Sequence, residues 1–117
     1  METSVPLKQI KVAFSAAFQG EGDGAKVRRF IGVQSLPDLD PFLMLDMGRV
    51  MLPAGFPDHP HRGFETVSYI LEGSISHEDS HGHKVILNTG DLQWLTTGKG
   101  VIHSDLPTSF TEPTRAF

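Results

Sequence analysis

The sequence contains no cysteine among its 117 residues. A chain without cysteine has no disulfide framework, no thiolate metal site and no cysteine nucleophile. Positive charge is also scarce, since 10 lysines and arginines stand against 14 acidic residues and give a net charge of −4. This balance provides no long-range attraction to nucleic acid or to an anionic membrane. We therefore expect no direct binding to either.

Long hydrophobic runs are missing as well. No apolar run approaches the roughly 18 residues that a membrane-spanning helix needs. Residues 1–14 mix Glu2, Lys8 and Lys11 into their apolar residues and lack the hydrophobic stretch of a signal peptide. We expect a soluble protein of the cytosol or nucleus. With 38% hydrophobic residues, the chain is long enough for one domain with one core.

Short strands separated by glycine, proline, asparagine and aspartate make up the chain. The sequence predicts strands at residues 7–18, 26–33, 42–47, 64–71, 74–78, 84–87, 92–97 and 101–105. The nearly continuous apolar run at 42–47 indicates a buried strand, and Glu72-Gly73 indicates a hairpin turn between 64–71 and 74–78. No segment longer than about two turns has helical periodicity. The pattern predicts an all-β antiparallel sandwich or barrel.

Two pairs of potential metal ligands stand out among these strands. His59 and His61 are separated by one residue, and so are His103 and Asp105. Residues two apart in a strand project from the same face of its sheet. If the two strands are neighbours, three imidazoles and one carboxylate meet in a small volume. That ligand set suits a first-row transition metal.

The sequence around these pairs resembles a known family. Residues 55–73 and 90–103 resemble the first and second cupin motifs. The segments GFPDHPHRGFETVSYILEG, HEDSHGH, GDLQW and TGKGVIHSD are similar to the N-terminal cupin domain of the pirin family. The resemblance implies a cupin (jelly-roll) domain at 20–107, preceded by an N-terminal strand region at 1–19 and followed by a divergent tail at 108–117. It also implies one metal, most often iron.

The pirin ligand pattern of three histidines and one glutamate maps onto His59, His61, His103 and position 105. Asp105 replaces the glutamate here, and its reach is shorter by more than about 1 Å, whereas metal–oxygen distances tolerate only about 0.2 Å. The alternative carboxylate is Glu65, which corresponds to the usual glutamate ligand of other cupins and lies two strand steps beyond His61 on the same face. We favour Asp105. Such a site leaves positions free and suits Fe²⁺, or Mn, Co, Ni or Cu.

The resemblance implies two kinds of function. One is an iron-dependent transcriptional cofactor of the nucleus and cytoplasm, which binds transcription factors of NF-κB type or other nuclear proteins. The other is a quercetin 2,3-dioxygenase, in which a flavonol hydroxyl binds the metal and loses its proton to Glu65. No cofactor besides the metal is implied.

The C-terminus suggests a third reading. In pirins an apolar strand and a second cupin domain follow this point, whereas the chain ends at residues 112–117. We expect that this ending lacks the strand, as in a truncated isoform, a fragment or a shortened gene copy. A sheet edge exposed in this way favours self-association and an inactive interaction fragment.

Several residues have simpler structural interpretations. His77, His81 and His83 lie in a polar hairpin and loop, where surface histidines are common. Lys26, Arg28 and Arg29 form a basic patch that is either solvated or a partner-binding surface. Core positions are expected for three aromatic residues: Phe42, Phe64 and Trp94.

Overall fold

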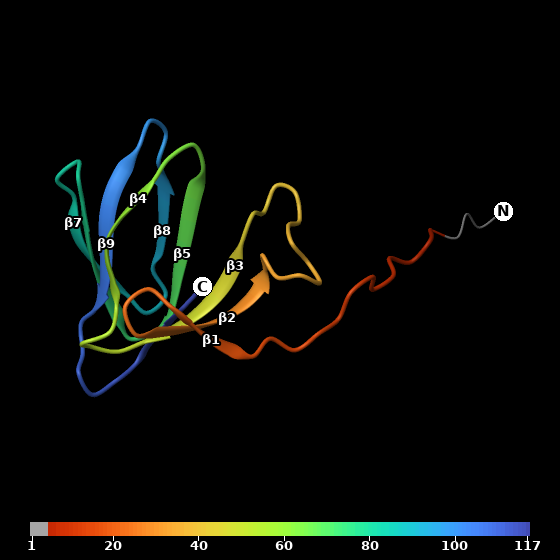
Figure 1. Cartoon of the computed structure of the whole chain (residues 1–117), viewed down its shortest axis with the longest axis horizontal. Helices are drawn as coiled ribbons and strands as arrows, with labels where there is room; N and C mark the ends of the chain where they lie inside the picture. Colours follow the sequence, from red (N-terminus) through yellow and green to blue (C-terminus); the bar gives the residue numbers. More distant parts are fainter. Residues whose placement is uncertain (1–4) are drawn as a thin grey trace.

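The computed structural model describes residues 5–117, which form ten strands and no helix. The strands make two antiparallel sheets that face each other (Figure 1). The larger sheet contains, in spatial order, β1 (Phe18–Glu21), β2 (Ala25–Ile31), β3 (Leu45–Val50), β10 (Thr114–Ala116), β5 (Glu65–Glu72) and β8 (Leu92–Thr96). The smaller sheet contains β4 (Phe56–His61), β9 (Val101–Pro107), β6 (Ser74–Asp79) and β7 (Lys84–Asn88). The predicted all-β antiparallel architecture is confirmed.

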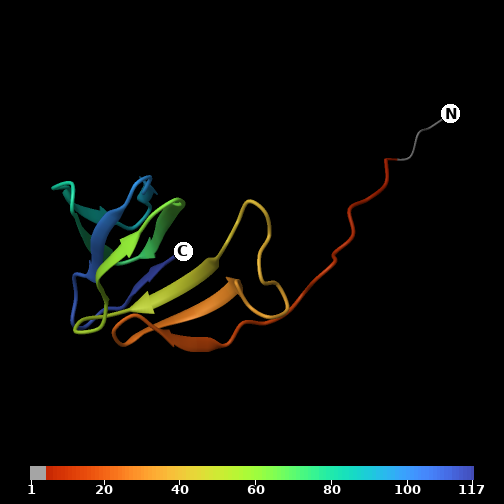
Figure 2. The same ribbon diagram turned by 45° about the horizontal axis from the view of Figure 1, so that its top comes forward.

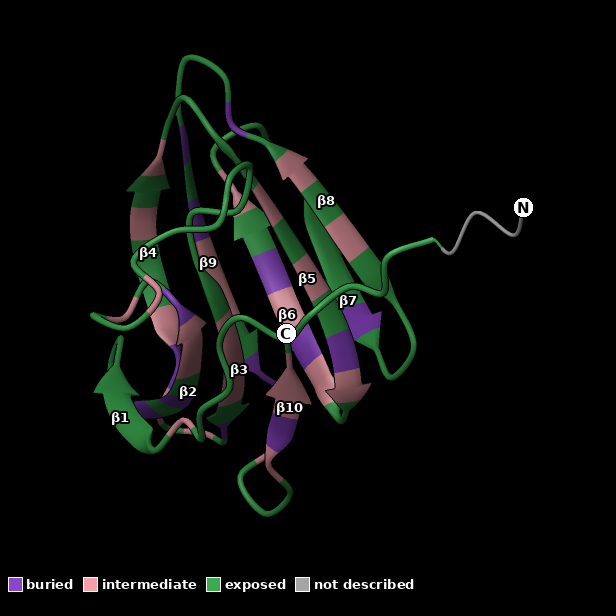
Figure 3. Cartoon of the chain, turned by 90° about the vertical axis from the view of Figure 1, so that its right-hand side faces the viewer, coloured by how far each residue is buried: buried purple, intermediate pink, exposed green. Residues whose placement is uncertain are grey.

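The apolar core lies between the two sheets. Ile70 of β5, Ile75 of β6 and Leu87 of β7 pack together there, with Ala116 of β10 against them. Buried residues alternate with exposed ones along the first half of β2 and with half-buried ones along β6, as the two-residue period of a strand requires (Figure 3). The core is small, and much of the apolar surface of the chain stays outside it.

The chain changes sheets at the predicted hairpin. β5 pairs with β8 and β10, whereas β6 pairs with β7 and β9, so β5 and β6 belong to different sheets. The prediction of a hairpin at Glu72-Gly73 is therefore wrong. Gly73 has a φ of 78°, and a Cβ there would lie 2.7 Å from Thr114 Oγ1 of β10. A glycine at this position allows the crossing chain to pass close beneath β10.

The N-terminal segment does not form the predicted strand. The first strand begins only at Phe18, and residues 5–17 lead away from the sandwich almost fully exposed (Figures 1 and 2). Leu7 is 92% exposed. The apolar residues of 5–17 have no sheet neighbour, and a strand gains its stability from such neighbours.

The interpretation of 42–47 as a buried strand is also wrong. Strand β3 starts at Leu45, and Phe42, Leu43 and Met44 are exposed in the preceding loop. Core positions for Phe42, Phe64 and Trp94 are wrong too, since these side chains are 60%, 39% and 62% exposed. Trp94 alternates with the half-buried Gln93 and Leu95, which occupy the inward positions of β8.

The C-terminal residues contribute a strand. Thr114–Ala116 form β10, which pairs with β3 on one side and β5 on the other. The expectation that this ending lacks a strand is therefore wrong. Thr114 is 1% exposed and donates a hydrogen bond from Oγ1 to the carbonyl of Ser74, 2.9 Å away. In residues 5–117 there is no helix long and apolar enough to span a membrane.

Candidate metal centre

Three of the predicted ligands converge on one face of the smaller sheet. Strands β4 and β9 are antiparallel neighbours, and His59 lies directly opposite His103. The ring centroids are 4.3 Å apart for His59 and His103, 4.8 Å for His59 and His61, and 5.0 Å for His61 and His103. Each ring offers a nitrogen, and the three nitrogens lie within 4.8 Å of one another. This spacing is compatible with shared coordination of one ion.

His103 is the most informative member of the group. It is 4% exposed, and neither of its ring nitrogens has a hydrogen-bond partner. Its Nδ1 lies 3.2 Å from Asp105 Oδ2, but this contact does not meet hydrogen-bond geometry. A buried polar group without a partner costs about 1–3 kcal/mol. A metal ion bound by the ring would remove this cost, so the site fits a divalent transition metal.

The other two histidines are arranged to offer a ring nitrogen to a metal. His59 Nδ1 lies 2.8 Å from the Pro57 carbonyl and donates to it, which leaves the lone pair on Nε2. Burial lowers the pKa of His61, and the charges of His59 and His103 lower it further against the opposing effect of Asp105. A neutral imidazole is the form that binds metals.

Asp105 is held in a second group. A carboxylate oxygen of Asp105 and ring nitrogens of His77 and His103 lie within 4.8 Å of one another. His59 and His61 do not belong to this second group. Oδ1 accepts a hydrogen bond of 2.8 Å from His77 Nδ1. Burial acts to raise the pKa of Asp105, but the contacts with His103 and His77 outweigh burial and lower it. The carboxylate is therefore ionised beside two imidazoles.

His77 lies inside the molecule, and its interpretation as a surface histidine is wrong. It is 1% exposed and lies in β6 opposite Asp105 of β9. The sequence did contain a signal for this burial, because His77 lies two residues after the apolar Ile75 and so points to the same face of the strand. His81 and His83 are exposed, as expected.

Asp79 binds the ring nitrogen of His77 that does not contact Asp105. Its side chain is 2% exposed and accepts hydrogen bonds from His77 Nε2 at 3.3 Å and His83 Nδ1 at 2.8 Å. The backbone amides of His81 and His83 donate to the same carboxylate. Burial acts to raise the pKa of Asp79, but the hydrogen bonds from His83, His77 and His81 outweigh it and hold the pKa well below its usual range.

Glu65, the alternative carboxylate and candidate base, stands apart from both groups. It lies on β5 of the larger sheet, so the expectation that it shares a face with His61 of β4 is wrong. Its side chain is exposed and accepts a hydrogen bond of 3.0 Å from Thr96 Oγ1. Its role as a base stays a prediction.

A cavity of about 370 Å³ reaches the second group from the side of β7 and β8. This volume is within the range of small-molecule pockets. Its lining combines His77 of the second group and its buried partner Asp79 with apolar residues of both sheets: Val85, Trp94 and Leu95.

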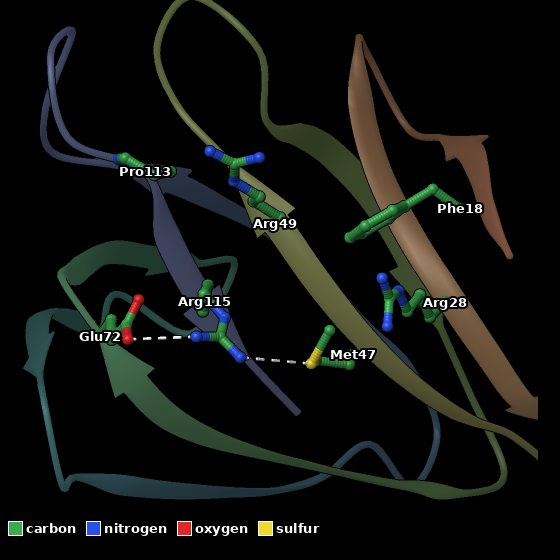
Figure 4. A pocket seen from close by; sticks show the side chains of 7 residues that line it. All are labelled: Phe18, Arg28, Met47, Arg49, Glu72, Pro113 and Arg115. Atoms are coloured by element: carbon green, nitrogen blue, oxygen red, sulfur yellow. Dashed lines mark hydrogen bonds and ion pairs between the residues drawn. The ribbon is translucent and has the colours of Figure 1, made fainter. Parts of the chain in front are cut away.

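A basic face covers the outside of the larger sheet. Lys26, Arg49 and Arg115 lie directly opposite one another on β2, β3 and β10. Arg28 lies beside them, 4.4 Å from the centre of the Phe18 ring. Figure 4 shows the arginines around a cavity of about 370 Å³, in which Glu72 binds Arg115. We call Lys26, Arg28, Arg49 and Arg115 the basic face.

The predicted basic patch needs one correction. Arg29 does not belong to the basic face, because it binds Asp46 at 2.7 Å and Glu21 at 2.8 Å. The hydrogen bonds from Arg29 to Asp46 raise the pKa of Arg29, and burial opposes them with a smaller effect.

Comparison with known proteins identifies the family. A family model described as Pirin matches residues 24–117. The chain belongs to the pirin family. A pirin-like protein of Solanum lycopersicum is 61% identical over 92 residues, which cover 79% of this chain and 32% of that protein. Pirin of Homo sapiens is 53% identical over 103 residues, which cover 87% of this chain and 36% of that protein. The chain thus spans about a third of the length of these relatives.

Solved structures confirm the cupin fold of this pirin domain. The bacterial pirin YhhW of Escherichia coli, in complex with nickel(II), matches with a TM-score of 0.71 and 25% identity over 86% of this chain and 45% of that chain. A structure described as quercetin 2,3-dioxygenase from Acinetobacter baumannii matches with a TM-score of 0.71 and 32% identity, over 87% of this chain and 39% of that chain.

Proposed function

We propose that this pirin-family domain binds one divalent transition metal, most favourably Fe²⁺, through His59, His61 and His103. The observation that supports this most directly is the buried imidazole of His103, both of whose nitrogens lack hydrogen-bond partners. Imidazole ligands of this kind suit iron and its neighbours, including the nickel that the Escherichia coli pirin structure contains.

Metal content of the purified chain tests this proposal. We expect about one equivalent by elemental analysis after loading with Fe²⁺ under anaerobic conditions. His59→Ala should reduce the content to background, because it removes one of three converging ligands. His81→Ala is the matched control, since His81 is exposed and lies in neither group. Wild-type protein without bound metal would contradict the proposal.

We further propose a role as a transcriptional cofactor of the nucleus and cytoplasm that acts through protein partners, such as factors of NF-κB type. The basic face supports this role. Like charges opposite each other on adjacent strands destabilise a sheet, and an acidic partner surface would offset this repulsion. The chain's net charge of −4 makes such a cluster of cations locally unusual.

Binding assays with and without metal test the cofactor role. We expect capture of a transcription factor of this type to depend on metal and to weaken at least tenfold in Arg49→Glu. Lys99→Glu makes the same charge change outside the basic face. Equal capture in all samples, or none, would reject the cofactor role.

A quercetin 2,3-dioxygenase is the alternative function. The similarity to the structure described as quercetin 2,3-dioxygenase from Acinetobacter baumannii supports it, with 32% identity over 87% of this chain. When bound, the metal would supply a Lewis acid for the flavonol hydroxyl, and dioxygen would open the ring with loss of carbon monoxide. Glu65 is the predicted acceptor of the hydroxyl proton, and it would have to reach the substrate from β5 of the opposite sheet.

The test of the enzyme is loss of flavonol absorbance by metal-loaded protein in oxygenated buffer. Glu65→Gln should lower the rate at least tenfold if Glu65 is the base. Full metal content without any loss of quercetin would exclude the enzyme and favour a catalytically inactive interaction fragment.

A further inference from the structure

We infer that Asp105 does not bind the metal but holds His103 from behind, and that buried His77 positions Asp105 for this task. The inference rests on the proposed metal binding by His59, His61 and His103. It assigns Asp105 a role different from that of the glutamate it replaces in the pirin ligand pattern.

Both oxygens of Asp105 face imidazoles. Oδ1 accepts the hydrogen bond of 2.8 Å from His77 Nδ1, and Oδ2 lies 3.2 Å from His103 Nδ1. Nδ1 of His103 faces Asp105 Oδ2 but lacks hydrogen-bond geometry, so Nε2 is the nitrogen left for a metal. A small turn of the ring on metal binding would give Nδ1 its hydrogen bond to Asp105. A carboxylate that accepts from the second nitrogen of a ligand histidine fixes its tautomer and orientation and makes it a stronger ligand.

The length of the Asp105 side chain also argues against its binding the metal. Asp105 lies on the same strand as His103, two residues away, but its carboxylate groups with His77 and His103 and not with His59 and His61. An aspartate is one methylene shorter than a glutamate, and a metal bond tolerates only about 0.2 Å of error. The shorter side chain is therefore suited to hold His103 and not to reach past it.

His77 has no free nitrogen for a second metal. Its Nδ1 is engaged by Asp105 at 2.8 Å and its Nε2 by Asp79 at 3.3 Å. Asp79 is itself held by His83 and by two backbone amides. The group of His77, His103 and Asp105 is therefore the support of one metal centre and not a second centre.

Cobalt(II) binding, followed by its visible spectrum, tests the inference, because band positions report the ligand set and titration reports affinity. We expect Asp105→Asn to bind one cobalt with unchanged bands and roughly 10–100-fold lower affinity, as measured for other outer-shell partners. Asp105→Glu should change the bands, because the longer carboxylate reaches the metal.

A double-mutant cycle tests the role of His77. We expect His77→Gln to weaken cobalt binding about as much as Asp105→Asn, and the double variant to be no weaker than either single variant. If His77→Gln does not fold, Asp79→Asn tests the same support one step further away. His81→Gln is the control on the neighbouring loop and should leave affinity unchanged.

The outcomes separate the two proposals. Wild-type protein that binds no cobalt overturns both the metal site and this inference. Stoichiometric binding with altered bands in Asp105→Asn keeps the metal site and overturns the inference, because Asp105 would then be a ligand. Losses that add in the double variant remove the positioning role of His77.

Discussion

At the scale of single residues, His103 combines a stability cost with a function. Its ring is buried, and its nitrogens have no hydrogen-bond partners within the part of the chain that the structure describes. Polar atoms in protein interiors are almost always paired, so such an exception calls for an explanation. Metal binding provides this explanation. It also implies that the protein is less stable without metal than with it.

Replacement of His103 by leucine should therefore separate stability from binding. In the absence of metal we expect His103→Leu to change the free energy of unfolding by no more than about 1 kcal/mol, because removal of an unpaired buried polar group offsets the loss of the favourable contact with Asp105. His61→Leu is the control: it removes a ligand that is only half buried, and we expect a change within about 0.5 kcal/mol. Urea denaturation of chelated samples measures both, and a marked loss of stability in His103→Leu would contradict the prediction.

The buried carboxylate of Asp79 should make stability depend on pH. Burial acts to raise its pKa, but hydrogen bonds from His83, His77 and His81 lower it below the value in the unfolded chain. A lowered pKa stabilises the folded state above the unfolded pKa of about 4, and this contribution is lost as the pH falls through the folded pKa.

We therefore expect the free energy of unfolding to fall more steeply between pH 5 and pH 3, a window set by the unfolded pKa of about 4, in wild-type protein than in Asp79→Asn. Glu78→Gln changes the exposed neighbour and should keep the wild-type slope. Equal slopes for all three proteins would show that Asp79 is not the source.

At the scale of elements, the crossing from β5 to β6 decides the architecture. The two strands are joined by Gly73 alone, yet they belong to different sheets. The crossing brings Gly73 against Thr114 of β10, whose hydroxyl binds the carbonyl of Ser74. This contact ties the C-terminal strand to the point where the chain changes sheets.

Gly73→Ala should test the importance of this contact. A Cβ at this position would lie 2.7 Å from Thr114 Oγ1 and 3.0 Å from Thr114 Cα, in addition to the cost of the left-handed backbone. We expect a loss of about 3 kcal/mol, as overpacking and a strained φ together suggest. Gly90→Ala is the matched control, because Gly90 has a φ of 91° but open space around it.

For Gly90→Ala we expect only the backbone cost of about 1 kcal/mol. Chemical denaturation measures both values. Similar losses for the two variants would mean that the crossing is not tightly packed.

At the scale of the whole molecule, apolar side chains gather on the outside of β5 and β8. Val67 lies opposite Trp94, and Tyr69 lies opposite Leu92. All four are exposed by 42–62%. A contiguous apolar surface of this kind favours burial against another molecule.

We expect the isolated chain to self-associate through this surface, with a mass above that of the monomer at concentrations of about 0.1 mM, the range in which exposed apolar surface drives association. Trp94→Lys should shift the chain to the monomer, because it places a charge at the centre of the surface. Phe110→Lys alters an equally exposed aromatic residue outside it. Sedimentation velocity measures the masses, and a monomeric wild type would refute the prediction.

The sequence by itself determined the features that depend on local periodicity. The two-residue period of a strand was enough to predict short antiparallel strands and the common orientation of His59 with His61. The family resemblance, carried by both histidine segments, supplied the cupin topology and the position of His103.

Only the tertiary structure decided which strands are neighbours, and the remaining differences follow from that. Glu65 lies on β5 of one sheet and the three histidines on β4 and β9 of the other, and the pairing of β6 with β9 brings His77 against Asp105. None of these contacts is encoded by spacing along the chain, because a side chain's partner across a sheet depends on the register of a strand that is distant in sequence.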